Sequence, residues 1–200
     1  MSRSRRRVIL AITGASGAIL GIRTLELLQA AGIETHLIVS AAARQTIPAE
    51  TGWSVDQVEA LANFCYEPGQ IGARIASGSF VTDGMLVVPC SIKTLSGIAN
   101  SYADNLIVRA ADVCLKEGRK LVLAVRETPL HLGHLRLMQQ AAQAGAVIFP
   151  PVPAFYAGHR TLDDVVTDLA GRILLRMGIE NDAYNRWEGN EAFDPNSGDV

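Results

Sequence analysis

The chain has 200 residues, of which 48% are hydrophobic and 19% are charged, and its formal net charge is −2. This length fits one domain with a core of ordinary size. The small net charge excludes a general affinity for nucleic acid, so any functional positive charge must be local. No apolar run approaches the roughly 20 residues that a transmembrane helix needs, and we expect no contact with a membrane.

The first residues resemble a signal peptide only superficially. Four arginines lie within the first seven residues, but Thr13 and Gly14 end the following apolar run, VILAI, after five residues. A secretory apolar region needs roughly 7–15 residues. The three cysteines, Cys65, Cys90 and Cys114, are far apart and odd in number, which argues against a disulfide framework and against structural zinc. We therefore expect a cytoplasmic protein.

Apolar runs and helical periodicities alternate along the chain, with glycine or proline between most of them. In chain order we expect a strand at Val8–Thr13, a helix at Ala18–Ala31, a strand at Thr35–Ser40, helices at Ala41–Glu50 and Val55–Asn63, a strand at Gly84–Pro89, a helix at Asn105–Gly118, a strand at Leu121–Val125, a helix at Leu130–Ala144, a strand at Ala146–Phe149 and a helix at Thr161–Met177.

Three segments between these elements are expected to be loops, and one proline lies inside an expected helix. The glycine-containing stretch Pro68–Gly78, the hydroxyl-rich CSIKTLSG at 90–97 and the proline-rich PPVPAFYAGH at 150–159 are expected to be loops. Pro48 should bend or break the helix in which it lies, because proline removes a backbone donor. Thr161 should cap the last helix.

The expected strands are continuous apolar runs, which is the pattern of strands buried on both faces of a parallel sheet. Because helices follow the strands, the sequence predicts an α/β fold with a doubly wound, mostly parallel sheet. We expect a single domain over residues 1–188, followed by a polar tail at 189–200. Ligands bind such sheets beyond the carboxyl ends of the strands.

The glycine-rich turn TGASGAILG follows the first strand and opens the first helix, which is the place where a phosphate binds a helix N-terminus. Its glycines have the spacing GxxGxxxG and not GxGxxG, and the second strand ends in Ser40 without an acidic residue for a ribose. These features argue against a nicotinamide enzyme and are compatible with a mononucleotide such as FMN. A tight turn that binds no ligand remains the alternative.

Four charged residues stand out in the segment from 85 to 129. Arg109 and Lys116 are seven residues apart, so they project from the same face of a helix. Arg126 and Glu127 leave the next strand together. This pattern indicates a site for a phosphorylated compound beside a carboxylate. The alternative is a solvated helix face, with Glu127 stabilising the start of the following helix.

Seven ordered segments carry a resemblance to a known family, from about Val8 to Trp187. They are TGASGA, Ser40 at a strand end, ASGS, PCSIKTLSG, NLIVRAADV-LKE, VRETPLHLGHLRLM and PPVPAFY. Together they resemble the flavin prenyltransferases. The resemblance implies a Rossmann-like flavoprotein fold, assembled as a homododecamer. It also implies transfer of a dimethylallyl group from dimethylallyl monophosphate to N5 and C6 of reduced FMN, without a metal. Phosphate would be released, and the prenylated FMN would serve a partner decarboxylase.

The resemblance also implies roles for individual residues. The FMN contacts would be Gly14, Ala15, Ser16, Ser40, Ser91, Ile92, Lys93, Thr94 and Arg126. The contacts to the prenyl phosphate would be Arg109, Lys116, Arg126, Tyr156 and Arg172, with Trp187 at the edge of the site. The catalytic residues would be Ser16, Glu50, Glu127 and Lys116, with the two carboxylates as acid and base.

Two related functions remain as alternatives. One is an FMN-dependent cysteine-type decarboxylase, but that class has a PASANT-type loop where this chain has PCSIKT. It also has a catalytic histidine after the first helix, whereas the first helix of this chain contains no histidine. The other is an accessory subunit of an aromatic-acid decarboxylase. Which decarboxylase is served, in quinone synthesis or in phenolic-acid breakdown, is open at this stage. Cys90 is expected to be a small buried residue and not a nucleophile.

Overall fold

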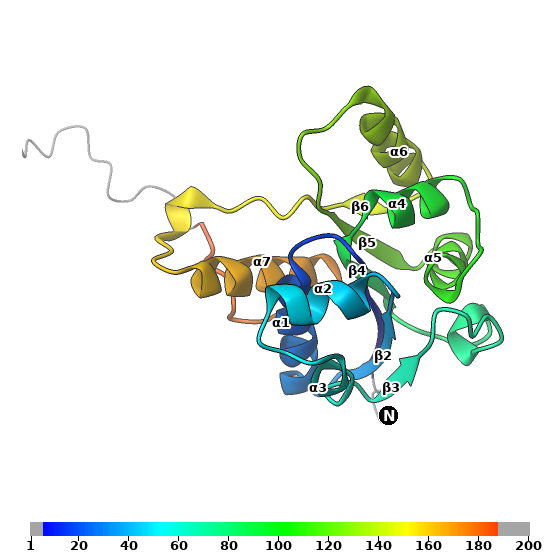
Figure 1. Cartoon of the computed structure of the whole chain (residues 1–200), viewed down its shortest axis with the longest axis horizontal. Coiled ribbons are helices and arrows are strands. Elements are labelled where there is room, and N and C mark those ends of the chain that lie inside the picture. The colour runs from blue at the N-terminus through cyan, green and yellow to red at the C-terminus, as the bar shows by residue number, and fades with distance from the viewer. Residues whose placement is uncertain (1–5, 188–200) are drawn as a thin grey trace, which may run out of the picture.

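The computed structural model describes residues 6–187, and its centre is a six-stranded sheet of order β3-β2-β1-β4-β5-β6. The strands are β1 (Arg7–Ile12), β2 (Glu34–Val39), β3 (Phe64–Tyr66), β4 (Gly84–Cys90), β5 (Lys120–Val125) and β6 (Val147–Ile148). Every adjacent pair is parallel. The predicted doubly wound, parallel α/β fold is therefore confirmed, and the sheet lies at the centre of Figure 1.

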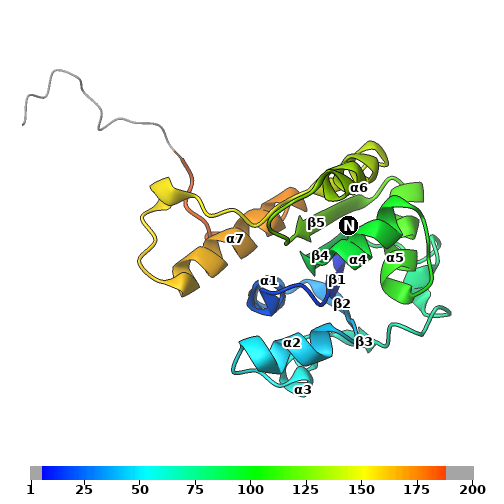
Figure 2. The same ribbon diagram turned by 45° about the horizontal axis from the view of Figure 1, so that its top comes forward.

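Helices cover both faces of the sheet (Figure 2). They are α1 (Ala18–Ala30), α2 (Ala43–Glu50), α3 (Val55–Glu59), α4 (Ile92–Ala99), α5 (Leu106–Lys116), α6 (Leu132–Gln143) and α7 (Leu162–Arg176). Helices α1, α2, α3 and α7 share one hydrophobic core with the sheet, and α4, α5 and α6 share the other. The two cores take alternate residues of each strand. In β1, for example, Leu10 packs on the first side and Ile9 on the second.

Local sequence explains where several helices begin. The side chains of Ser54, Ser91, Asn105 and Thr161 each accept a hydrogen bond from a backbone N–H in the first turn of the following helix. Thr161 forms a reciprocal capping box with Asp164, so the predicted cap of α7 is confirmed. Such caps satisfy backbone donors that have no partner inside the helix.

Four local features differ from what the sequence led us to expect. The segment CSIKTLSG contains most of α4 and is not a loop, because Ser91 caps a helix whose apolar residues Leu95 and Ile98 are buried. The short strand β3 was not expected, since only three residues pair with β2. Pro48 lies inside α2, which continues to Glu50. Helix α3 ends at Glu59, four residues before the predicted end.

Two predicted loops each contain a short 3₁₀ turn, at Arg74–Ala76 and Phe155–Ala157. The polar tail predicted at 189–200 lies outside the described residues. Within residues 6–187, no helix is long and apolar enough to cross a membrane.

Candidate functional site

The chain order of the strands places a cleft at the carboxyl edge of the sheet. Strands β2 and β3 lie on one side of β1, and β4, β5 and β6 lie on the other, so the direction of winding reverses between β1 and β4. Open α/β sheets bind ligands at this switch point. The structure has a cleft of about 730 Å³ there, which is within the size range of small-molecule sites.

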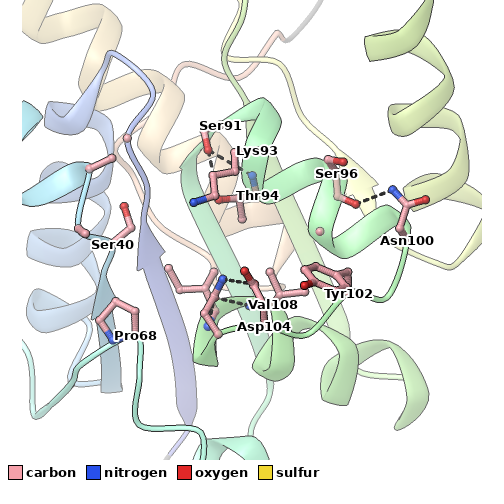
Figure 3. A pocket seen from close by; sticks show the side chains of 16 residues that line it. Ser40, Pro68, Ser91, Lys93, Thr94, Ser96, Asn100, Tyr102, Asp104 and Val108 are labelled. Atoms are coloured by element: carbon pink, nitrogen blue, oxygen red, sulfur yellow. Dashed lines mark hydrogen bonds between the residues drawn. The ribbon is translucent and has the colours of Figure 1, made fainter.

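The residues that line the cleft come from the segments after β1, β2, β3 and β4 and from the start of α5 (Figure 3). Five of them are residues predicted to contact the flavin: Gly14, Ser40, Ser91, Lys93 and Thr94. The others are Ala41, Ala42, Pro68, Ser96, Gly97, Asn100, Tyr102, Asp104, Asn105, Ile107 and Val108. The cleft thus combines hydroxyl groups and one cation with apolar side chains.

The first glycine turn needs its glycines for two different reasons. Gly17 precedes α1 in the left-handed backbone conformation, with φ of 99°, which side chains disfavour. A Cβ atom on Gly14 would lie 2.3 Å from the Cβ atom of Ala42. The turn therefore runs against the start of α2 and borders the cleft, with Ala15 buried and Ser16 exposed beside Gly14.

Glu50 reaches this turn from the end of α2. Its Oε2 atom accepts hydrogen bonds from the backbone N–H groups of Gly17, at 2.7 Å, and Ala18, at 3.4 Å. A carboxylate at this position interacts favourably with the N-terminus of α1. The structure thus brings together Glu50 and the turn that carries Ser16, two residues predicted to be catalytic.

A buried threonine joins the ends of β1 and β4 at the switch point. The hydroxyl of Thr13 donates to the carbonyl oxygen of Pro89 at 2.7 Å and accepts from the backbone N–H of Ser91 at 2.8 Å. Ser91 in turn accepts from the N–H of Thr94 and donates to its hydroxyl, at 3.3 and 3.2 Å. The first turn of α4 is therefore held in a fixed position beside the glycine turn.

On the other side of the cleft, Ser40 accepts a hydrogen bond from the start of α2, as Ser91 does from the start of α4. Its hydroxyl oxygen accepts a hydrogen bond from the N–H of Ala43 at 3.1 Å, and its own backbone N–H donates to Ile12 at 3.0 Å. Lys93 is exposed on the first turn of α4 and is the cation that lines the cleft. Hydroxyl groups, helix N-termini and a lysine form a suitable environment for a phosphate.

Sequence reasoning missed the far end of the cleft. Asn100, Tyr102 and Asp104 lie in the connection between α4 and α5, and the Tyr102 side chain is 69% exposed. The segment has no motif that indicates a ligand. Its position follows from α4, and α4 was predicted to be a loop.

The predicted phosphate-binding cations lie on opposite faces of the sheet. Arg109 and Lys116 are on α5, a helix that packs on the same side of the sheet as α4 and α6. Arg109 donates to the carbonyl oxygen of Ala76 at 3.2 Å, and Lys116 pairs with Glu117. Arg172 is half-buried on α7, on the other face. Within one copy of the chain, these cations do not surround a common point.

Arg126 and Glu127 follow β5 and are both exposed. The backbone N–H of Arg126 donates to the carbonyl oxygen of Cys90 at 3.1 Å, which places Arg126 next to the start of α4. The Oε1 atom of Glu127 accepts from the N–H of Thr128 at 3.0 Å. Both residues therefore lie at the carboxyl edge of the sheet, next to the segment that lines the cleft.

Tyr156 and Trp187 contact each other although they are far apart in sequence. Their rings meet edge to face, with centroids 5.1 Å apart and an interplanar angle of 69°. Tyr156 lies in the 3₁₀ turn before α7, and Trp187 is the last described residue. The structure thus brings together one predicted contact to the prenyl phosphate and the predicted edge of its site.

Cys90 could be considered as a nucleophile, and the neighbouring His131 and His134 as metal ligands. Cys90 is fully buried, and burial raises the pKa of its thiol to about 12, so it is a poor nucleophile. The rings of His131 and His134 are tilted by 34° relative to each other, with centroids 3.6 Å apart. Within residues 6–187, no group of three or more His, Cys, Asp or Glu side chains is arranged to hold a metal ion.

Comparisons with known proteins show the family to which this chain belongs. The family model called Flavoprotein matches residues 1–174. The flavin prenyltransferase UbiX of Escherichia coli K12 is 57% identical over 187 residues, which cover 92% of this chain and 99% of the relative. The corresponding enzyme of Thauera aromatica is 53% identical over 185 residues, covering 92% of this chain and 95% of the relative.

A solved structure gives information about ligands. The crystal structure of AnUbiX (PadA1) in complex with FMN and dimethylallyl pyrophosphate superposes with a TM-score of 0.91 at 48% identity, covering 92% of this chain and 98% of that chain.

Proposed function

This chain belongs to the flavin prenyltransferase family, and we propose that it transfers a dimethylallyl group from dimethylallyl monophosphate to N5 and C6 of reduced FMN, with release of phosphate. The observation that carries this proposal is the cleft at the switch point, which gathers five predicted flavin-binding residues from the segments that follow β1, β2 and β4. The flavin prenyltransferases of Thauera aromatica and Escherichia coli K12, at 53% and 57% identity, support a prenyl transfer to the flavin.

The cleft fits a mononucleotide in size and in chemistry. Its polar part contains the first turn of α4 with Ser91, Lys93 and Thr94, where hydroxyl groups, a cation and free backbone N–H groups suit the phosphate of FMN. Its apolar part contains Ile107 and Val108, which suit a flat ring system. When bound, reduced FMN supplies the electron-rich ring that accepts the prenyl group. AnUbiX, 48% identical to this chain, binds FMN and dimethylallyl pyrophosphate.

Cations stabilise the phosphate that leaves the prenyl group. A departing phosphate carries negative charge, and cations in a site shielded from water stabilise that charge strongly. We assign this role to Arg109, Lys116, Arg126 and Arg172, with a hydrogen bond from Tyr156. Arginine provides two parallel hydrogen bonds to a phosphate, whereas lysine acts as a compact charge.

This assignment requires more than one copy of the chain. The sheet separates Arg172 on α7 from Arg109 and Lys116 on α5, so a phosphate held by all three must lie between neighbouring protomers. We therefore propose a homo-oligomer, and specifically a dodecamer. A supporting structure, the dodecameric FMN-dependent UbiX-like decarboxylase of Escherichia coli O157:H7, has a TM-score of 0.89 and 48% identity and covers 92% of this chain and 100% of that chain.

Carboxylates move the protons that the reaction requires. Forming the second bond to the flavin removes a proton from C6, and an exposed carboxylate at the carboxyl edge of the sheet is a suitable acceptor. Glu127 has this position, directly after β5. We assign Glu50 and Ser16 to the N5 side of the flavin, because the glycine turn that carries Ser16 also donates a hydrogen bond to Glu50 from Gly17. The prenylated FMN then passes to a partner decarboxylase.

The test is mass spectrometry of the flavin after anaerobic incubation with reduced FMN and dimethylallyl monophosphate. We expect the released flavin to gain one C₅H₈ unit. In Lys116→Ala, the KM for dimethylallyl monophosphate should rise about ten- to hundredfold, because a hydrogen bond to a charged group is lost, while bound flavin is unchanged. The matched control is Lys120→Ala, which should behave like wild type. Lys120 is at the start of β5, at the end of the strand away from the cleft. Loss of flavin in Lys116→Ala would contradict the assignment of Lys116.

A second candidate function is supported by one observation. The Escherichia coli O157:H7 structure is called an FMN-dependent decarboxylase. If this chain were such an enzyme, the same incubation would return unmodified FMN, and the protein would release carbon dioxide from an added acid substrate. A gain of mass by the flavin excludes that outcome as the main activity.

A further inference from the structure

A second hollow lies between α1 and α7, on the side of the sheet opposite α5. Its volume is about 490 Å³, and Asp168 of α7 lies at its wall. The Asp168 side chain is only 3% exposed. Its Oδ1 atom accepts a hydrogen bond from the backbone N–H of Asn185 at 2.9 Å, whereas its Oδ2 atom has no hydrogen-bond partner among residues 6–187. Burying a carboxylate oxygen without a hydrogen-bond partner is unfavourable. Proteins retain such unfavourable groups mainly at functional positions.

Three segments meet at Asp168. The Asn185 side chain, whose backbone bonds to Asp168, donates from Nδ2 to the carbonyl oxygen of Ala157 at 2.9 Å. The Nε2 atom of His159 lies 3.7 Å from Oδ1 of Asp168, an ion-pair distance when the imidazole is protonated. The 3₁₀ turn, helix α7 and the segment leading to residue 187 are thus joined at one buried point.

The other charged groups around the hollow already have partners. Asp163 pairs with Arg23 of α1 at 2.7 Å. Asp164 accepts from the backbone N–H of Thr161 at 2.9 Å in the capping box. Asp168 is therefore the carboxylate of the hollow that contacts the segment of His159 before α7 and the segment of Asn185 after it.

These connections end next to the aromatic pair. Tyr156 directly precedes Ala157, and Trp187 is two residues after Asn185. Both residues are more than half exposed in one copy of the chain, at 55% and 57%, so within that copy little packing fixes their rings apart from their contact with each other. Their orientation must therefore depend on the backbone that Asn185 and Asp168 hold in place.

We propose that Asp168, Asn185 and His159 form a positioning cluster that holds Tyr156 and Trp187 at the prenyl end of the active site. The cluster acts through the backbone and does not touch the substrate. This inference rests on the proposed function, in which Tyr156 binds the prenyl phosphate. Breaking the cluster should weaken donor binding and leave flavin binding intact.

The test uses Asn185→Ala, which removes the link to Ala157, and Asp168→Asn, which removes the charge but keeps an acceptor for the Asn185 N–H. We expect Asn185→Ala to raise the KM for dimethylallyl monophosphate about three- to tenfold, the effect of one net hydrogen bond, with little change in kcat or in the KM for FMN. Asp168→Asn should keep most of the wild-type KM. The control is Glu180→Gln, which breaks an exposed ion pair with Arg186 in the same segment.

A second measurement needs no substrate. The chain has two tryptophans, so a Trp53→Phe background leaves the fluorescence of Trp187 alone. In Asn185→Ala, acrylamide should quench Trp187 more strongly than in the control, with an unchanged melting temperature. Unchanged quenching and unchanged KM would overturn the positioning cluster. If the wild type failed to prenylate FMN, the proposed function would fail, and the quenching result would still decide for or against the cluster.

Discussion

At the scale of single residues, Glu50 connects the end of α2 to the turn that opens α1. It lies 33 residues after Gly17 in the sequence, yet it accepts hydrogen bonds from the N–H groups that open α1. The same contact holds the carboxylate next to the turn of Ser16. A group that stabilises the turn is thus also in a position to act on a ligand that binds there.

Two substitutions separate the contact of Glu50 with the start of α1 from the proton transfer that we propose for it. Glu50→Ala should lower the free energy of unfolding by about 1 kcal/mol, the usual effect of losing a helix cap. Glu50→Gln keeps an acceptor oxygen and should recover most of that stability. If Glu50 transfers a proton, Glu50→Gln should still be strongly impaired in flavin prenylation. Urea unfolding and the flavin mass assay measure the two effects, and a fully active Glu50→Gln would exclude the proton transfer.

At the scale of elements, a buried histidine joins β2 to the edge strand β3. His36 is fully buried and stacks on Phe64 of β3, with ring centroids 4.9 Å apart. Its Nε2 atom lies 3.1 Å from Oε1 of Glu34, and its Nδ1 atom lies 3.0 Å from the Tyr66 hydroxyl. This cluster attaches the three-residue edge strand β3 to β2 through side chains as well as through the backbone.

Burial lowers the pKa of His36, and the nearby Arg74 and Arg7 add to this effect, although Glu34 opposes it. The unfolded chain therefore binds a proton at His36 at a higher pH than the folded chain. Stability should fall as the pH drops through about 6.5, the ordinary pKa of histidine. Burial opposes the lowering of the Glu34 pKa, but His36 and Arg7 overcome it, so the contribution of Glu34 is lost only in more acidic solution.

The prediction is a difference in slope between two proteins. Urea unfolding of the wild type from pH 8 to pH 5 should show decreasing stability below about pH 6.5. His36→Gln cannot titrate and should be less stable throughout, because its stacking is lost, but with a smaller decrease over this range. Equal slopes in the two proteins would show that His36 does not cause the decrease.

At the scale of the whole molecule, α6 exposes apolar side chains that a monomer would leave in water. Leu132 and Leu135 are 62% and 48% exposed, and Ala141 is the buried residue of the helix. The sequence predicts one apolar face with Leu132, Leu135 and Met138, but only the last of these packs against the core. Exposed apolar patches mark interfaces, and the proposed oligomer gives this one a partner.

The interface can be tested by adding charge to α6. Leu132→Lys combined with Leu135→Lys should convert the assembly into smaller species, as measured by light scattering after gel filtration, with unchanged circular dichroism because lysine favours helices. Prenylation should fall with the assembly, since the proposed phosphate site needs cations from neighbouring copies. Gln143→Lys, at the other end of α6, is the control. An intact assembly of the double variant would exclude this face as an interface.

The sequence by itself determined the parallel α/β fold, because buried strands are continuous apolar runs and helices follow them in the chain. The glycine-rich turn indicated a ligand at Gly14, and the family resemblance indicated Ser40 and Ser91 as flavin contacts. All three residues lie at strand ends, and parallel strands bring these ends to one edge. Only the tertiary structure decided the contact of Glu50 with α1, the path of residues 100–104 and the opposite faces of α5 and α7. Contacts between distant segments depend on how helices pack on the sheet, and that packing leaves no periodic pattern in the local sequence.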